Sequence, residues 1–135
     1  LPKGTYYITM TKGWPYSVDP NYAGMYTFKT TFTDVPKTTV SKVKNLSSGK
    51  LKVTWKCKSK ATGYQIQIAT DKKFKKNVKK AVVTKNQTVT KKITKLKPGK
   101  KYYVKVRTYK EVKSGTKKVR IYSDWSKKKA VQIKK

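Results

Sequence analysis

The sequence predicts an all-β protein: a sandwich of seven short strands, preceded by a β-hairpin extension. Apolar and polar residues alternate in short runs through residues 40–133, which is the period typical of strands with one buried face. Turn signals such as Ser48-Gly49 and Pro98-Gly99 separate these runs at the spacing of a β-sandwich. At 135 residues, the chain has room for one domain of ordinary size and an additional piece.

Residues 1–36 are expected to form a hairpin remnant and a linker. The runs 4–11 and 24–32 are rich in aromatic and β-branched residues, and the glycine and prolines of residues 12–23 are typical of a loop. Residues 33–39 form the linker, because Pro36 disfavours helix before it. A lone hairpin is marginal in water. It should therefore pack on the following domain, pair with a second copy to give a homodimer, or be partly disordered.

Residues 37–135 are expected to form the sandwich. Its strands cover residues 40–46, 50–58, 63–70, a strand centred on 81–83, 87–96, 100–109, and 119–133 with a break around 123–126. Residues 71–80 form a lysine-rich connection with one helical turn around Lys73-Phe74, and residues 110–118 form a loop. Lys91 departs from the pattern, since the alternation places it inward; either its stem snorkels at a sheet edge or the register shifts there.

The clearest strand pattern is that of residues 100–109, directly after Pro98-Gly99. One face carries Tyr102, Val104 and Val106, and the other carries Tyr103, Lys105, Arg107 and Tyr109. The strand is therefore half-buried, with an aromatic and cationic outer face. The core is expected to contain Trp55, Tyr64, Ile66, Val104 and Val106.

A leucine, a proline-glycine turn and a Tyr-x-Val-x-Val run resemble the corner before strand F of a fibronectin type III domain. The residues that carry this resemblance are Leu96, Pro98, Gly99, Tyr102, Val104 and Val106. The resemblance implies a seven-stranded immunoglobulin-like sandwich over residues 37–135, with Tyr102 in a tyrosine corner whose hydroxyl bonds to backbone upstream. Trp55 matches the tryptophan on strand B of this family, and residues 64–68 match strand C.

Residues 122–126, Tyr-Ser-Asp-Trp-Ser, resemble the Trp-Ser-x-Trp-Ser box of the cytokine-receptor branch, with tyrosine in place of the first tryptophan. The resemblance implies a cation–π ladder in which Lys105 and Arg107 sandwich the rings of Tyr122 and Trp125. We expect this ladder to be structural rather than a binding site.

Residues 1–8 and the run Gly24-x-Tyr26-x-Phe28 resemble the last two strands of the bacterial pre-peptidase C-terminal domain. Only the tail of that fold is present, so no calcium site can be carried over. The chain begins Leu-Pro, with no signal peptide and no transmembrane run. We interpret it as a fragment of a secreted or surface-attached bacterial multidomain protein, whose neighbouring domains are its first partners.

The net charge is +31, from 36 lysines and arginines against five acids. Such a chain attracts anionic polymers such as cell walls or glycans. Only Arg107 and Arg120 are arginine, and lysine lacks the planar fork that reads phosphates and bases bidentately, so specific nucleic-acid binding is disfavoured. The connection after residue 70 carries the candidate polyanion contacts Lys72, Lys73, Lys75, Lys76, Lys79 and Lys80. The lysines after the tryptophan motif, Lys127, Lys128 and Lys129, belong to the same candidate surface. A diffuse solvated surface remains the favoured interpretation.

Catalysis is not expected. The chain has no histidine, and its five acids lie scattered over different segments. Cys57 continues the alternation of Leu51, Val53 and Trp55, which predicts a buried thiol without a base partner. We therefore expect no enzyme, no cofactor, no metal site and no membrane insertion.

Three aromatic residues of the first part are candidate glycan contacts: Trp14, Tyr16 and Tyr22. They could stack on sugars, as in a carbohydrate-binding or adhesin module, although packing at the domain junction is the simpler interpretation. Two alternatives to a charged spacer thus stay open: that module, and an accessory domain of a secreted peptidase or glycosidase.

Overall fold

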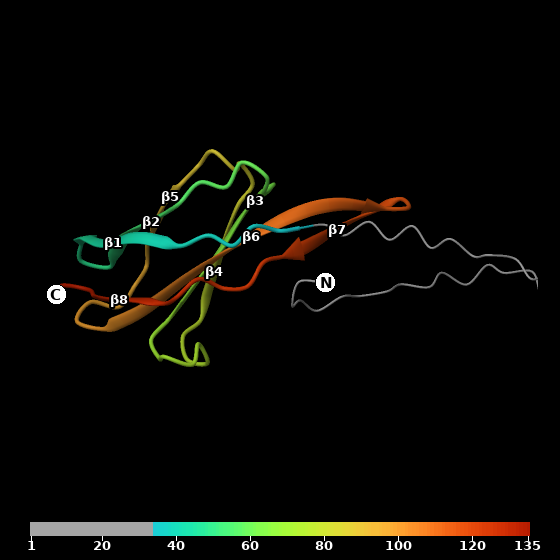
Figure 1. Cartoon of the computed structure of the whole chain (residues 1–135). Coiled ribbons are helices and arrows are strands. Elements are labelled where there is room, and N and C mark those ends of the chain that lie inside the picture. Colours follow the sequence, from blue (N-terminus) through green and yellow to red (C-terminus); the bar gives the residue numbers. More distant parts are fainter. Residues whose placement is uncertain (1–33) are drawn as a thin grey trace, which may run out of the picture. The chain divides into compact units, whose positions relative to one another are not determined.

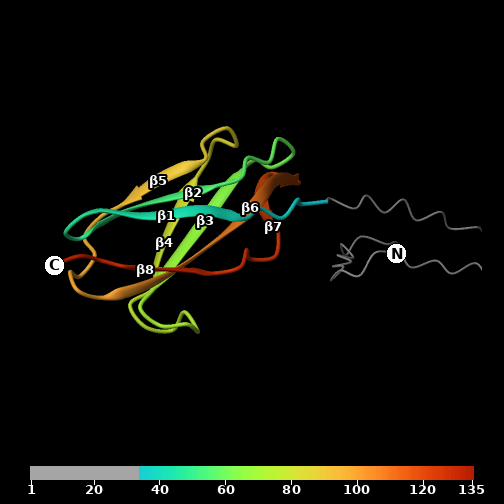
Figure 2. The ribbon, with the colours of Figure 1, turned by 60° about the vertical axis from the view of Figure 1, so that its left-hand side comes forward.

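The computed structural model describes residues 34–135, which form two antiparallel sheets packed face to face (Figures 1 and 2). The smaller sheet has the order β1-β2-β5, with β1 at Val40–Ser47, β2 at Lys50–Trp55 and β5 at Thr90–Ile93. The larger sheet has the order β4-β3-β6-β7, and β8 also pairs with β6. Its strands are β3 (Gly63–Ala69), β4 (Lys79–Val83), β6 (Lys101–Ser114), β7 (Lys117–Tyr122) and β8 (Lys129–Gln132). The predicted all-β sandwich is confirmed.

The core lies between the two sheets and is built by alternate residues of the central strands. All five residues that the sequence placed there, Trp55, Tyr64, Ile66, Val104 and Val106, are at most 2% exposed. The rings of Trp55 and Tyr64 lie 5.2 Å apart, one from each sheet. Burying a side chain of this kind contributes about 1.5–3 kcal/mol, so these contacts dominate the stability of the sandwich.

The predicted loop over residues 110–118 is wrong, because β6 runs on to Ser114 and pairs with β7 in a long hairpin. Figure 1 shows this hairpin projecting beyond the other strands. Val112 lies opposite Val119, and the turn follows at Gly115, whose φ is +64°. Lysines at many of its positions hide the strand pattern, although the alternation of polar and β-branched residues continues. The expected break after residue 122 is present, since β7 and β8 are separate strands.

The connection between β3 and β4 contains a tight turn instead of the expected helical turn. The Phe74 N–H donates to the Asp71 carbonyl at 3.2 Å, and Phe74 and Asn77 have φ values of 57° and 50°. These left-handed conformations interrupt any helix at once. Figure 2 shows the connection extending away from the strands.

The prediction that Cys57 is buried is wrong, because β2 ends at Trp55 and the alternation no longer applies after it. The chain turns away from the sheet where Tyr64 accepts a hydrogen bond from the Lys58 N–H at 2.8 Å. Cys57 is exposed, with its Sγ 3.3 Å from the Asn86 carbonyl oxygen. Lys91 pairs with Val53 in the expected register, and its side chain is exposed at the edge strand β5.

The described chain enters and leaves at opposite ends of the sandwich (Figure 1). Near the entrance, the buried Thr108 hydroxyl donates to the Pro36 carbonyl at 2.6 Å. Near the exit, the Ile133 N–H donates to the Lys100 carbonyl at 3.0 Å. Residues 34–135 contain no helix that could cross a membrane. The expected N-terminal hairpin lies outside the described residues, whereas residues 34–39 of the expected linker are described and belong to no strand.

Candidate binding surface

The outer face of the larger sheet gathers cations and aromatic rings along the middle of β6. Arg107 and Lys105 lie opposite Gln65 and Gln67 of β3. The Arg107 Nε donates to Gln65 Oε1 at 2.8 Å, which fixes the guanidinium above the sheet. Burial lowers the pKa of Arg107, so this cation is held partly out of water.

The segment between β7 and β8 is held to β6 by two serines, each of which makes one backbone and one side-chain hydrogen bond. The Ser123 N–H donates to the Thr108 carbonyl at 3.0 Å, and the Ser123 hydroxyl accepts from the Thr108 N–H at 3.1 Å. Ser126 makes the same pair of bonds with Val106. Between these two clamps the chain bulges, and Trp125 is presented over the face of β6.

The expected ladder residues do meet. The Lys105 Nζ lies 4.5 Å from the Trp125 ring centre, and the Arg107 Cζ lies 4.3 Å from the same ring. Arg107 also contacts Tyr122 at 3.8 Å, and Lys105 contacts Phe74 at 4.2 Å. Contacts of this kind contribute about 0.5–1 kcal/mol each when exposed. The ladder therefore begins at Phe74, which the sequence alone did not place there because its position depends on the turn after β3.

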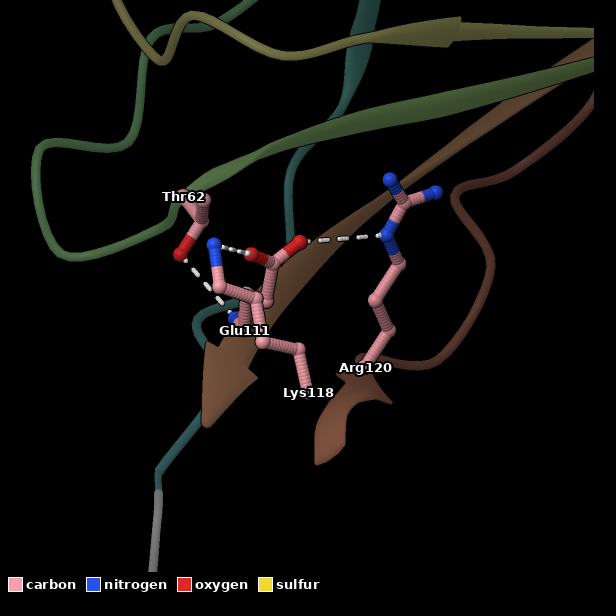
Figure 3. A network of polar contacts seen from close by, with 4 residues as sticks. All are labelled: Thr62, Glu111, Lys118 and Arg120. Carbon is pink, nitrogen blue, oxygen red and sulfur yellow. Dashed lines mark hydrogen bonds and ion pairs between the residues drawn. The ribbon is translucent and has the colours of Figure 1, made fainter. Parts of the chain in front are cut away.

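The ladder continues into the β6–β7 hairpin. Arg120 lies 4.6 Å from the Tyr109 ring centre, and Tyr109 lies 6.0 Å from Tyr122. Glu111 pairs with Lys118 at 3.3 Å and Arg120 at 3.6 Å, while its N–H donates to the Thr62 hydroxyl at 3.0 Å (Figure 3). This network ties the projecting hairpin to the start of β3.

At the other end of the ladder an open surface hollow of about 460 Å³ is lined by lysines from three separate segments. The lining residues are Lys72, Lys73, Phe74, Lys105, Ser126, Lys127 and Lys128. The Lys128 Nζ lies 3.3 Å from the Lys72 carbonyl oxygen, which joins the β3–β4 connection to the segment before β8. Burial lowers the pKa of Lys105, and the nearby charges of Arg107 and Lys128 lower it further.

Asp71 shapes the wall of this hollow. Its carboxylate accepts hydrogen bonds from the N–H groups of Lys73, Lys75 and Lys76, at 3.1, 2.9 and 2.7 Å. The pKa of Asp71 is lowered from its ordinary 3.8, most strongly by the Lys76 N–H. The acid therefore binds the backbone of the turn, and it leaves the ammonium groups of these lysines free of an ion pair with Asp71.

The six lysines that the sequence grouped as polyanion contacts do not form one cluster. Lys72 and Lys73 line the hollow. The Lys79 ammonium donates to the carbonyls of Thr94 and Lys95, on the core-facing side of β4. Lys80 lies on the outer face opposite Gln67, and Lys75 and Lys76 contribute backbone N–H groups to the turn. The sequence grouped Lys127 and Lys128 with Lys72 on one candidate surface, but it did not place Lys105 there, because that contact depends on how distant segments meet.

The expected tyrosine corner is present in geometry. Tyr102 is 2% exposed, and its hydroxyl accepts a hydrogen bond from the Lys97 N–H at 2.9 Å. Leu96 is 4% exposed beneath it, and Pro98 begins the exposed turn. Gly99 takes a φ of +71°, and its N–H donates to the Ile133 carbonyl at 2.8 Å. The three glycan candidates Trp14, Tyr16 and Tyr22 lie outside the described residues.

No group of three metal-ligating side chains occurs in residues 34–135. Within the same range, the carboxylates of Asp71 and Glu111 are engaged with backbone and with cations respectively. The lysine side chains described above therefore present a surface of ammonium groups, which suit the binding of anions.

Comparison with known proteins agrees with this fold. The family model of the fibronectin type III domain matches residues 35–123. Among solved structures, the FN1–FN3 domains of chicken CNTN1 are 29% identical with a TM-score of 0.57, over 73% of this chain and 30% of that chain. The chain thus spans less than a third of that three-domain structure.

Single domains are also similar. The fn3 domain of human contactin 1 is 22% identical with a TM-score of 0.54, over 84% of this chain and 92% of that chain. The FN5 domain of Drosophila Lar is 24% identical with a TM-score of 0.54, over 73% of this chain and 95% of that chain. A search of curated proteins finds no match. The family match over most of the chain, with the tyrosine corner and the two-sheet sandwich, shows that this chain belongs to the fibronectin type III domain family.

Proposed function

We propose that this chain is a non-catalytic module of a multidomain extracellular protein, which spaces its neighbouring domains and retains them near anionic polymers. The observation that carries the proposal is the charge of +31, most of which has no carboxylate partner. Within residues 34–135 the ion pairs are those of Glu111 with Lys118 and Arg120. Fibronectin type III domains are typically extracellular spacers or interaction domains, which supports the same role.

The attraction would be long-ranged and largely blind to sequence. Both sheets contribute: on the smaller sheet Lys44, Lys52 and Lys92 lie opposite one another across β1, β2 and β5. Like charges placed directly opposite cost stability, so this row favours an environment that supplies counter-charge. Lysine is a hydrated point charge, and its field is screened over about 8 Å at physiological salt.

We further propose that the parent protein is a bacterial secreted or surface-attached protein, and that cell-wall polymers or host glycans supply the negative charge. The resemblance of residues 1–8 and 24–28 to the last two strands of a pre-peptidase C-terminal domain supports this origin. The partners would then be the neighbouring domains and the anionic polymer, without insertion into a membrane. A homodimer through the N-terminal hairpin is compatible with this role.

A titration tests the proposal. The full chain is mixed with purified cell-wall polymer, with heparin and with a neutral glycan, at low and at near-physiological salt. If about six lysines contact phosphate or sulfate groups, the affinity should fall with salt with a slope near five on logarithmic axes. Salt-resistant binding to the neutral glycan would instead support a carbohydrate-binding module with Trp14, Tyr16 and Tyr22. No binding to either anionic polymer would overturn the proposal.

A further inference from the structure

We propose that the hollow lined by Lys72, Lys73, Lys105, Lys127 and Lys128 is a specific site for the sulfate or phosphate groups of an anionic polysaccharide. This inference rests on the proposed attraction to anionic polymers and gives that attraction a place on the surface. These five lysines, together with Phe74 and Ser126, form a surface that we name the lysine hollow.

Positive charge converges on the lysine hollow from three segments that are far apart in the chain. Lys72 and Lys73 belong to the β3–β4 connection, Lys105 to the middle of β6, and Lys127 and Lys128 to the segment before β8. None of the described residues that line the hollow carries a carboxylate. The lowered pKa of Lys105, caused first by burial, agrees with cations that lack a compensating anion. A bound oxyanion would compensate the partly buried charge of Lys105 and reduce the repulsion between the neighbouring cations.

The site is preorganised by the turn after β3. Asp71 holds the N–H groups of Lys73, Lys75 and Lys76, and the Thr70 N–H donates to the Lys76 carbonyl at 3.1 Å. Phe74 is held at a φ of 57°, a conformation that costs about 1 kcal/mol or more for a residue with a side chain. A turn shaped in this way presents its lysines without having to be ordered again when a ligand binds.

The chemistry of the lysine hollow favours an oxyanion on a sugar over a nucleic acid. Lys105 lies between the rings of Phe74 and Trp125, at 4.2 and 4.5 Å from their centres. Arg107 contacts the Trp125 ring as well, at 4.3 Å. These rings are thus engaged by cations of the chain, which disfavours the stacking on which single-stranded nucleic-acid binding depends. Ammonium groups remain as the recognising groups, and they suit sulfate and phosphate.

Two triple variants of the full chain with the same change in charge separate a site from diffuse attraction. K72Q/K73Q/K128Q removes three cations of the lysine hollow. K44Q/K52Q/K92Q removes the lysine row on the outer face of the smaller sheet. The probes are a heparin hexasaccharide, a phosphomannan oligosaccharide and inorganic phosphate, measured by calorimetry at several salt concentrations. We expect the first variant to lose at least about tenfold more affinity for the oligosaccharide than the second, with a shallower salt slope.

For one single substitution, a preorganised site and diffuse attraction predict changes in affinity of opposite sign. Asp71→Asn keeps every lysine and raises the net charge by one, so diffuse attraction predicts equal or tighter binding. Loosening the turn predicts weaker binding, by roughly threefold or more, because fewer ammonium groups are held in place. Circular dichroism and the thermal transition of each variant establish that it is folded before its binding is compared.

The outcomes are distinct. If the wild-type chain binds none of the anionic polymers, the proposed function fails. If it binds them but both triple variants lose affinity equally, the proposed function stands and the site is overturned. Preference for the heparin hexasaccharide over the phosphomannan oligosaccharide assigns the group as sulfate, and the reverse assigns it as phosphate. Binding of a thymidine oligonucleotide of matched charge more tightly than either polymer would overturn the assignment to a polysaccharide.

Discussion

Ser126 and Val106 exchange two hydrogen bonds across the broken edge of the larger sheet. The Ser126 N–H donates to the Val106 carbonyl at 2.9 Å, and the Ser126 hydroxyl accepts from the Val106 N–H at 3.0 Å. The side chain thereby takes the place of a strand backbone at a point where β7 has ended and β8 has not begun. The same segment carries Trp125, so the geometry of the ladder depends on this clamp.

Ser126→Ala should therefore destabilise the sandwich. The substitution leaves the buried Val106 N–H without its acceptor, which costs about 1–3 kcal/mol. Urea unfolding of the full chain measures the loss, and amide exchange should accelerate at Val106. The exposed Ser41 provides the matched control, since Ser41→Ala removes a hydroxyl without a described partner. Equal stability of the two variants would contradict the assigned role.

Tyr102→Phe should lose the hydrogen bond from the Lys97 N–H and keep the buried ring. The free energy of unfolding should fall by about 1–2 kcal/mol, because the Lys97 N–H loses the Tyr102 hydroxyl as its acceptor. Tyr103→Phe, one residue on and half-buried on the opposite face, should be close to neutral. Denaturant midpoints of the two variants are compared with a common denaturant dependence of the unfolding free energy. Destabilisation by Tyr103→Phe but not by Tyr102→Phe would show that the corner is not formed.

Gly63→Ala should be among the most damaging single changes. A Cβ at Gly63 would meet the Val83 carbonyl oxygen and lie 2.8 Å from the Tyr109 hydroxyl. Since the first of these is backbone of the paired strand β4, the sheet must shift, at about 3 kcal/mol or more. Gly115→Asn is the control: nothing lies within 4 Å of a Cβ there, and asparagine tolerates its positive φ. The thermal transitions of both variants decide the point.

Asp71 should make stability depend on pH in acid. Its folded pKa lies below 3.8, first because of the Lys76 N–H, so the unfolded chain binds the proton more readily. The carboxylate therefore stabilises the fold fully above that value, and the contribution is lost as the pH falls through the lower folded pKa. Asp71→Asn should flatten the stability curve in this window. Asp124→Asn serves as the control, and identical curves for the two variants would refute the role of the hydrogen bonds from Lys73, Lys75 and Lys76 to Asp71.

Cys57 should react in the native state. Because the side chain is exposed and makes one weak hydrogen bond, a maleimide should label it in the absence of denaturant. Oxidation should link two chains through this thiol, and Cys57→Ser should abolish both reactions. Protection of Cys57 until the protein unfolds would show that the thiol is buried.

The contrast between Trp55 and Cys57 shows what alternation can predict. Within β2 the period of two correctly identified the buried side chains, since burial in a sheet follows directly from the pleat. Cys57 was misplaced because the same period was extended past the residue where the chain leaves the sheet. Pattern gives the face of a residue only while the strand lasts, and the end of β2 is set by contacts with Tyr64 and Asn86.

The candidate site was less predictable than the core. Trp125 could be matched to Lys105 and Arg107 because all three lie in recognisable motifs. Phe74 could not, since its approach to Lys105 depends on a left-handed backbone conformation that its residue type does not indicate. The meeting of Lys72 with Lys128 was equally hidden, because it joins residues 56 positions apart in the chain.

Because the described chain enters and leaves at opposite ends of the sandwich, its topology determines how the fold responds to a pulling force. The two ends of the described chain are held by Thr108 of β6 and by Lys100, which directly precedes β6, and these residues are roughly 25 Å apart in an extended chain. β1 leads from the entrance and β8 leads to the exit, and both run in the sense opposite to β6. A pull between the two ends would load the hydrogen bonds of these strands together, in shear, rather than opening them one at a time. Such a module resists extension through the height of its unfolding barrier.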